Sequence, residues 1–185
     1  MKTVLITGGA GFIGSNIAAE LLKRDYQVKV LDNLSTGHLE NLDPIKDKKK
    51  FIKGDINDFD LLKKELTDVA FVLHQAALPS VPRSIDSPLD SHYNNSTGLV
   101  TLLEAAKQSG VKRVVCASSS SVYGDAKEEY KSEDLPNVPL SPYAVAKMMN
   151  EHYCRVFSQL YGIETVSLRY FNVFGPNQDP QSDYA

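Results

Sequence analysis

The chain has 185 residues, of which 42% are hydrophobic, and this length and composition predict one globular domain with a buried core. Its formal net charge of -3 at pH 7 gives no basic field for a polyanion, so we expect no nucleic-acid partner. The absence of a membrane-length apolar stretch and of a signal-peptide pattern, with only Cys116 and Cys154 present, predicts a cytoplasmic protein with reduced thiols and no membrane partner.

Strand and helix patterns alternate along the chain. Runs rich in valine and isoleucine predict strands at 3–7, 27–32, 50–55, 69–76, 111–118 and 163–170. Amphipathic segments between them predict helices at 12–24, 58–66, 92–110 and 142–162. This alternation predicts the α/β class, with a doubly wound parallel sheet that carries helices on both faces. The charged run DKKK before the third strand is interpreted as a solvated face without function.

The glycine-rich stretch TGGAGFIGSN joins the first predicted strand to the first helix. Gly9, Gly11 and Gly14 have the dinucleotide-binding spacing, and Gly8, Gly11 and Gly14 have the related three-residue spacing. Glycine at such a turn lets the backbone approach a pyrophosphate, while the free amides of the helix N-terminus face the anion. Glycines also serve turns and helix caps structurally, so the pattern gains weight only when a helix, a second strand and a carboxylate come after it in order.

An acidic residue ends the second predicted strand at the place that a dinucleotide site requires. Asp32 lies 18 residues after Gly14, where its carboxylate can accept the ribose hydroxyls of an adenosine. Because the carboxylate would repel a 2′-phosphate, NAD is favoured over NADP. After the third strand, Asp55 with Ile56 can hold the adenine edge, although an aspartate there is also an ordinary turn or cap residue.

A tyrosine and a lysine in YAVAK form a second constellation. Tyr143 and Lys147 are four residues apart on a predicted helix and so share one face, where the ammonium stabilises the phenolate. Such pairs also occur by chance on amphipathic helices. The upstream SSSSVYG places serine hydroxyls at the carboxyl edge of the sheet, where open parallel sheets bind ligands, although serine clusters are usually loops.

These motifs together resemble the extended short-chain dehydrogenase/reductase family, and within it the nucleotide-sugar 4-epimerases. The likeness runs through TGGAGFIGSN, LDNLSTG, GDI, HQAA, NNSTGLVTLLEAA, SSSSVYGD, PLSPYAVAK and LRYFNVFGP, and so covers essentially the whole chain. It implies a Rossmann fold, a bound NAD cofactor, a UDP-sugar substrate and no metal. It also implies a homodimer, formed by the helices at 92–109 and 141–161.

The resemblance assigns roles to residues of this sequence by position. The implied catalytic residues are Ser119 as the assisting hydroxyl, Tyr143 as the acid/base, and Lys147 as the group that binds the nicotinamide ribose and tunes the tyrosine. The implied cofactor contacts are Gly8, Gly11, Phe12, Ile13, Gly14, Asp32, Asn33, Ser35, Thr36, Gly37, Asp55, Ile56, Ala76, Ala77, Asn95, Tyr143, Lys147 and Phe171. The implied substrate contacts are Ser80, Arg83, Ser119, Tyr143 and Asn172, with Arg83 open to the alternative of a surface cation.

The choice among family reactions depends on the residues after the catalytic hydroxyl. Relatives that dehydrate the sugar use an Asp-Glu pair there, and those that decarboxylate use a glutamate at the second place. Ser120 and Ser121 occupy both positions here, so neither reaction has its carboxylic acid. The resemblance therefore implies 4-epimerisation of a UDP-sugar, UDP-glucose/galactose or UDP-N-acetylglucosamine/galactosamine, through a 4-keto intermediate. The segment HQAALPSVPRS is most similar to epimerases that act on UDP-N-acetylhexosamines.

The chain departs from the family in its length. Family members usually continue into a smaller C-terminal domain that holds most of the substrate, so residues 1–185 are expected to be the NAD-binding portion of a longer epimerase, with little activity alone. Three classes stay open: an epimerase, another NAD-dependent nucleotide-sugar enzyme (an oxidoreductase that releases NADH, a decarboxylase or a dehydratase), and a non-catalytic NAD-binding module.

Overall fold

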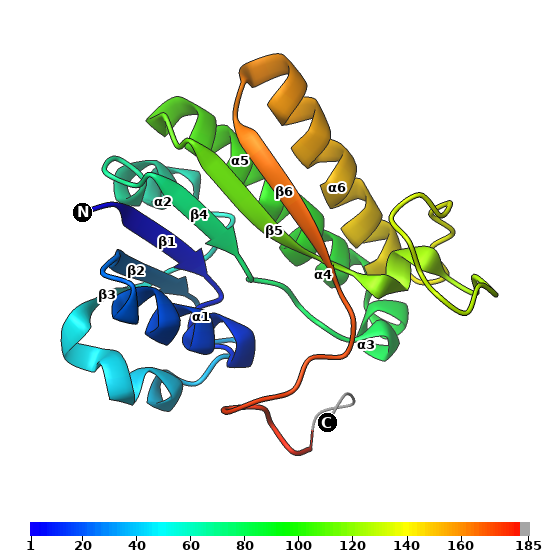
Figure 1. The fold of residues 1–185 in the computed structure, drawn as a ribbon, viewed down its shortest axis with the longest axis horizontal. Helices are drawn as coiled ribbons and strands as arrows, with labels where there is room; N and C mark the ends of the chain where they lie inside the picture. Colours follow the sequence, from blue (N-terminus) through cyan, green and yellow to red (C-terminus); the bar gives the residue numbers. More distant parts are fainter. Residues whose placement is uncertain (182–185) are drawn as a thin grey trace.

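Six parallel strands form the centre of the computed structural model, which describes residues 1–181 (Figure 1). Their order across the sheet is β3-β2-β1-β4-β5-β6. The strands are β1 (Thr3–Thr7), β2 (Gln27–Asp32), β3 (Lys49–Lys53), β4 (Phe71–His74), β5 (Arg113–Ser119) and β6 (Glu164–Tyr170). The order reverses between β1 and β4, so this sheet has the Rossmann topology that the sequence predicted, with a switch point at the carboxyl ends of those two strands.

The helices lie in two layers against the sheet. On one face are α1 (Phe12–Lys23) and the 3₁₀ segment η1 (Leu39–Lys48), and on the other are α2 (Phe59–Glu65), α5 (Gly98–Ser109) and α6 (Pro142–Tyr161) (Figure 1). Shorter elements are α3 (Val81–Asp86), α4 (Pro88–His92), the π-helical turn η2 (Tyr93–Thr97) and the 3₁₀ turn η3 (Ser120–Tyr123). All five residues of β1 are buried because both layers cover this strand.

Helix boundaries follow the local chemistry of the sequence. Gly110 and Gly162 end α5 and α6 with φ of +72°, a left-handed conformation that suits glycine. Ser141 caps α6 by accepting a hydrogen bond from the amide of Ala144, and Pro142 takes the first helical position. The single helix predicted at 92–110 was wrong at its start, because the π-helical turn η2 separates α4 from α5.

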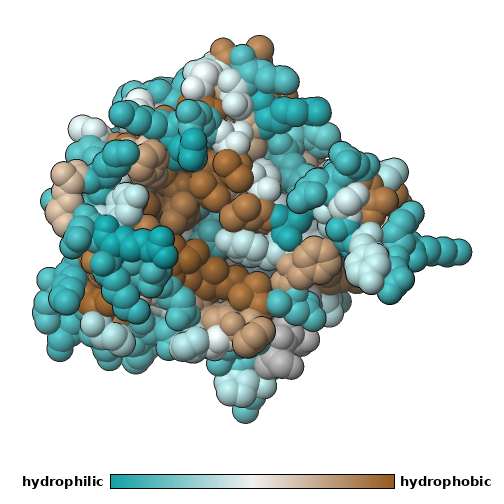
Figure 2. All heavy atoms as spheres, in the orientation of Figure 1, coloured by the Kyte–Doolittle hydropathy of each residue, from teal (hydrophilic) through white to brown (hydrophobic). Residues whose placement is uncertain are grey.

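One face of the sheet is covered only in part. Val166 and Leu168 on β6 are 40% and 41% exposed, although they are apolar. Figure 2 shows apolar side chains gathered near the middle of this face, where Figure 1 has β4, β5 and β6 without a helix in front. The predicted layers on both faces are therefore confirmed at β1 to β3, whereas β5 and β6 are covered from the α6 side alone within residues 1–181.

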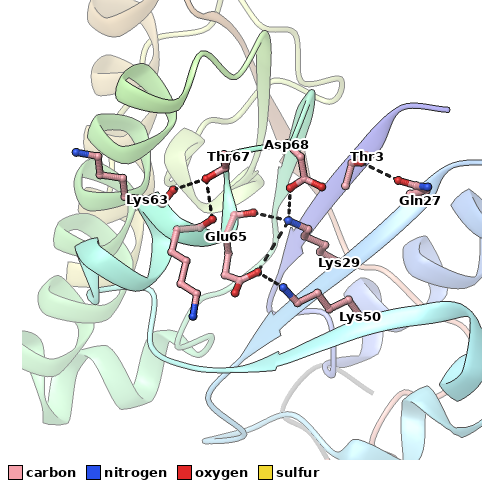
Figure 3. Close-up of polar contacts among 9 residues, drawn as sticks. Thr3, Gln27, Lys29, Lys50, Lys63, Glu65, Thr67 and Asp68 are labelled. Atoms are coloured by element: carbon pink, nitrogen blue, oxygen red, sulfur yellow. Dashed lines mark hydrogen bonds and ion pairs between the residues drawn. The ribbon is translucent and has the colours of Figure 1, made fainter.

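A buried carboxylate joins α2 to the sheet at the amino edge of the strands (Figure 3). Glu65, with its side chain 8% exposed, pairs with Lys50 at 2.6 Å, and Lys29 donates to the Glu65 carbonyl and to Asp68. Lys50, placed by the sequence in a solvated charged run, is thus part of a structural ion-pair network. An open hollow of about 550 Å³ lies beside this network. Of its charged lining residues, Lys29 is paired with Asp68 and Lys50 with Glu65.

Candidate active and cofactor-binding site

The glycine turn between β1 and α1 has no room for side chains. Gly8 has φ of +67°, and a Cβ there would lie 2.6 Å from the amide nitrogen of Ala76. A Cβ on Gly14 would lie 2.3 Å from the carbonyl oxygen of Gly8. Since both contacts are to backbone, any larger residue would push α1 off the turn or push away the loop after β4.

The N-terminus of α1 offers backbone amides at this turn. Gly11 is the N-cap residue and supplies no side-chain hydrogen bond, so the amides of the first turn, which contains Phe12 and Ile13, have no side-chain cap among residues 1–181. α1 is 12 residues long, and its dipole adds positive potential at this end. The arrangement suits a pyrophosphate.

Asp32 lies at the carboxyl end of β2, beside the glycine turn. Its carboxylate accepts hydrogen bonds from the amides of Ala10 at 2.9 Å and Leu34 at 2.8 Å, and the side chain is buried. These bonds use two of about four acceptor positions on a carboxylate, so two stay open for ribose hydroxyls. Gly37 packs against the same carboxylate, because a Cβ there would approach the Asp32 oxygen to 3.0 Å.

The loops after β2 and β3 are joined by one side-chain bond. Asn33 donates to Asp55 at 3.0 Å and accepts from the Ser35 amide at 3.0 Å. Burial raises the pKa of Asp55, but the hydrogen bonds from Asn57 and Asn33 together lower it by a larger amount, so its net pKa lies below the usual value. Asp55 thus stays ionised at the edge where the adenine is expected.

Three more predicted adenosine residues lie in different surroundings. Ser35 and Thr36 are exposed on the loop after β2. Ile56 is buried and contributes to the core that also contains α5, where a Cβ on Gly98 would meet it at 2.6 Å. The side chain of Ile56 is therefore occupied by packing, and only its backbone can face a ligand.

A buried histidine at the end of β4 connects the glycine turn to the second constellation. His74 Nδ1 lies 2.8 Å from Thr7 Oγ1, which itself accepts from the amide of Ala76 at 3.4 Å. The threonine hydroxyl and Nδ1 can share this hydrogen bond in either direction, and Nε2 has no partner among residues 1–181. Complete burial, and secondarily the charge of Lys147, lowers the pKa of His74 to about 3. The ring is neutral at physiological pH.

This histidine predicts an acid-sensitive fold. Between pH 6.5 and about 3 the histidine is protonated in the unfolded chain but not in the folded chain, so stability falls as pH decreases through this window. From pH 6.5 to about 5 the loss is about 2 kcal/mol. We expect His74→Asn, whose amide can replace Nδ1, to lose about 2 kcal/mol less than the wild type in urea unfolding over this range. Equal losses in the two proteins would contradict the assignment.

Lys147 and Tyr143 meet at the carboxyl end of β5. Lys147 Nζ donates to the carbonyl oxygen of Ala117 at 2.8 Å and lies 5.6 Å from the centre of the Tyr143 ring. Ala117 precedes Ser119 by two residues on the same strand, and Ser119 ends that strand as the N-cap of η3. Its hydroxyl accepts from the amide of Ser121 at 3.1 Å. All three predicted catalytic residues thus lie at one edge of the sheet, the edge that carries the glycine turn.

The ammonium of Lys147 has an unusual environment. Complete burial lowers its pKa to about 8, an effect that Cys116 partly offsets. Cys116 Sγ lies 3.4 Å from Cys154 Sγ, and both thiols are free. The lysine is thus a cation at neutral pH in an apolar setting, which is typical of functional groups.

The loop after β4 is held by an asparagine that the sequence assigned to the cofactor. Asn95, on the π-helical turn, accepts from the Leu78 amide at 2.8 Å and donates to the Leu78 carbonyl at 3.1 Å. Its side chain is buried, so its present role is to fix this loop, which includes Ala77. The loop leads into α3, where Ser80 has φ of +104° and accepts from the amide of Arg83, whose side chain is exposed.

The segment after β6 brings the last predicted residues to the same edge. Phe171 is 57% exposed, its ring centre lies 6.3 Å from that of Tyr123, and Asn172 is also exposed. Farther along, the Asn177 amide donates to Ser15 on α1 at 3.0 Å. The tail therefore crosses to the helix that starts at the glycine turn (Figure 1).

Sequence reasoning missed a polar cluster behind the catalytic candidates. Glu151 accepts hydrogen bonds from Ser118 and from Arg169. A signal for it exists, because Glu151 follows Tyr143 by two helical turns and Lys147 by one, on the same helix face. No group of three or more metal-ligating side chains occurs within residues 1–181.

The model of the NAD dependent epimerase/dehydratase family matches residues 4–185. The chain belongs to this family. A putative UDP-glucose 4-epimerase from Methanocaldococcus jannaschii is 41% identical over 182 residues, which are 97% of this chain and 59% of the relative. The family is NAD-dependent, and the predicted resemblance is confirmed. Over the part of the chain that the structure describes, no helix is long and apolar enough to span a membrane.

Solved structures of the family agree in fold. The UDP-N-acetylglucosamine 4-epimerase from Methanobrevibacter ruminantium, in complex with UDP-N-acetylmuramic acid, matches with a TM-score of 0.94 and 45% identity. The match includes 100% of this chain and 59% of the epimerase chain. The UDP-glucose 4-epimerase of Thermus thermophilus, in complex with NAD, matches with a TM-score of 0.92 and 42% identity. The match includes 98% of this chain and 59% of the epimerase chain. The chain thus spans 59% of the length of each of these relatives.

Proposed function

We propose that this chain is the NAD-binding part of an enzyme that epimerises a UDP-sugar at C4. The observation that carries the proposal is Lys147, a buried ammonium 5.6 Å from the Tyr143 ring and bonded to β5 two residues before Ser119. The family's members include UDP-glucose 4-epimerases, which supports the same reaction. Ser120 and Ser121, in place of carboxylic acids, disfavour dehydration and decarboxylation.

NAD fits the residues present. The glycine turn leaves space only for backbone, the first turn of α1 offers amides without a side-chain cap, and Asp32 keeps acceptor positions for ribose hydroxyls. The pyrophosphate would be held by Gly8, Gly11 and Gly14 with the amides of Phe12 and Ile13. When bound, NAD supplies the acceptor for hydrogen from sugar C4 and returns it to the other face.

The side chains of this chain supply the proton chemistry. Tyr143, as phenolate, removes the proton of the C4 hydroxyl, and Ser119 completes the hydrogen-bond path to the sugar oxygen. Lys147 stabilises the phenolate electrostatically, since its positive charge is poorly screened in a buried site. After the 4-keto sugar turns and C4 regains its hydrogen, Tyr143 returns the proton to the C4 oxygen, so the reaction has no net redox change.

The nucleotide sugar would be held by Ser80, the N-cap residue of α3, by Arg83 on α3, and by Asn172 on the segment after β6. We favour UDP-N-acetylhexosamines, because HQAALPSVPRS resembles their epimerases and because one similar structure is a UDP-N-acetylglucosamine 4-epimerase. The second domain, the cytoplasmic location and the low activity of residues 1–185 alone stay predictions.

A second copy of the chain is the proposed protein partner. On α6 the apolar side chains Val145, Tyr153, Val156 and Leu160 are 38% to 68% exposed. At 100° per residue they fall within about 80° of the helix surface, opposite Tyr143 and Lys147. We propose that this face joins two copies, and sedimentation measurements of the mass in solution will test it.

The test of function is incubation with UDP-glucose, UDP-N-acetylglucosamine and UDP-glucuronate separately. NMR of the products reads the configuration at C4, and absorbance reads reduced nicotinamide. Inversion at C4 without net NADH supports the epimerase. Steady NADH accumulation would instead establish an oxidoreductase, and NAD binding without any sugar conversion by a protein of the relatives' length would establish a binding module.

A further inference from the structure

A carboxylate on α6 is held by residues of β5 and β6 near the carboxyl ends of these strands, at the edge of the sheet that carries the catalytic candidates. Glu151 Oε1 accepts from Ser118 Oγ at 2.5 Å and from Arg169 Nε at 2.9 Å, while Oε2 accepts from Arg169 Nη2 at 2.8 Å. The two charged side chains are each 15% exposed. A two-pronged contact of this kind fixes orientation as well as distance. We refer to Glu151 and Arg169 as the clamp.

The fold brings the clamp together through two periodicities. Ser118 and Arg169 are partners in the register of β5 and β6, so their side chains leave the same face of the sheet. Glu151 follows Lys147 by one turn and Tyr143 by two, so the three share one face of α6. The clamp therefore fixes how α6, with its catalytic candidates, is rotated and displaced along β5.

Arg169 uses its other donors on the loop that leads into α6. Nη2 donates to Asn137 at 2.9 Å, Nη1 donates to the carbonyl of Glu133 at 3.4 Å, and the guanidinium lies 4.7 Å from the centre of the Tyr123 ring. Tyr123 ends η3, which begins directly after Ser119. One guanidinium thus contacts both the turn that follows Ser119 and the loop that precedes Tyr143.

The charge state of the clamp is fixed as well. Burial raises the pKa of Glu151, but the hydrogen bonds from Arg169 and Ser118 together lower it by a larger amount, so its net pKa lies below the usual value. The carboxylate is therefore ionised at neutral pH and is matched by the guanidinium. The clamp sets geometry without adding net charge beside Lys147.

We propose that Glu151 and Arg169 are positioning residues that set the separation between the Ser119 hydroxyl and the Tyr143 phenol. The inference rests on the proposed epimerase function. Neither clamp residue has a role in proton transfer. A displacement of about 1 Å in such an arrangement costs about 100-fold in rate, which sets the size of the expected effect.

The test compares Glu151→Ala with a matched control, Glu65→Ala. Glu65 is also a buried carboxylate held by two cations, but at the opposite edge of the sheet. Both variants are expected to lose stability, so they are compared under conditions where each is fully folded. The probes are NAD affinity, the rate of bound-NAD reduction by UDP-N-acetylglucosamine, and the carbon-13 ring signal of Tyr143, identified among nine tyrosines by its loss in Tyr143→Phe.

For Glu151→Ala we expect the reduction rate to fall by about 100-fold and the Tyr143 signal to move, with NAD affinity within about threefold of the wild type. Glu151→Gln keeps the side-chain length and one acceptor oxygen, so its reduction rate is expected to be about tenfold higher than that of Glu151→Ala. Glu65→Ala is expected to leave the rate and the signal unchanged.

The proposal is overturned if Glu151→Ala and Glu65→Ala change the rate and the Tyr143 signal equally, or if Glu151→Ala leaves the signal in place. The rates are measured in a protein of the relatives' length. If the wild type of that length reduces no NAD with any UDP-sugar, the proposed function fails, but the Tyr143 signal still decides whether the clamp positions the phenol.

Discussion

Lys147→Met is expected to make the protein more stable and to remove its activity. Burial lowers the lysine pKa from 10.5 to about 8, which corresponds to a cost of about 3 kcal/mol for folding with this ammonium at neutral pH. Methionine removes that cost and loses the hydrogen bond to the Ala117 carbonyl, worth about 1 kcal/mol. The net gain of about 2 kcal/mol raises Tm by roughly 4 to 8 °C for a chain of this size.

The pH dependence separates this cause from better packing. Between pH 8 and 10.5 the unfolded chain keeps a proton on residue 147 that the folded chain releases, so wild-type stability rises with pH in this window. The advantage of Lys147→Met must therefore shrink as pH increases. An advantage that is constant with pH would contradict the assignment. Lys63→Met, at an exposed lysine, is the control and should stay within about 0.5 kcal/mol of the wild type.

Tyr143→Phe is expected to lower sugar turnover about a thousand-fold while leaving NAD affinity within about threefold. The change removes only the phenolic oxygen. Lys147, the glycine turn and Asp32 keep their positions, because the ring still packs at the N-terminus of α6. Turnover is followed by NMR of the UDP-sugar, and NAD affinity by titration.

Tyr153→Phe serves as the matched control, since Tyr153 also lies on α6 but is 38% exposed, about 80° around the helix from Tyr143 on the face proposed to join two copies. It is expected to keep wild-type activity. If Tyr143→Phe also kept full sugar turnover, Tyr143 would not be the acid/base of the reaction.

The sheet and the glycine turn were predictable because their signals are local. A five-residue apolar run followed by closely spaced glycines determines both β1 and the turn, and the structure shows the backbone contacts at Gly8 and Gly14 that demand glycine. The bend before α5 was not predictable in this way. The π-helical turn at Tyr93–Thr97 positions Asn95 to hold the backbone of Leu78, a contact between segments that no helical periodicity reports.

The site was predicted as a set of residues but not as a network. Tyr143 and Lys147 are visible as a pair four residues apart, whereas Glu151, Ser118 and Arg169 meet only because β5 and β6 pair in one register. In the same way, Ile56 matches a family motif, yet its side chain is used in the core. Sequence spacing therefore predicts the candidate residues of the site, whereas tertiary packing determines which of their side chains are available to a ligand.

The uncovered side of β6 has a practical consequence for handling the protein. Val166 and Leu168 face outward from β6, which pairs only with β5 within residues 1–181, so unpaired backbone groups and exposed apolar side chains occur together. Such edges recruit further strands when molecules are crowded. We expect concentrated solutions to form oligomers without a fixed size, which light scattering across a dilution series will distinguish from a defined pair.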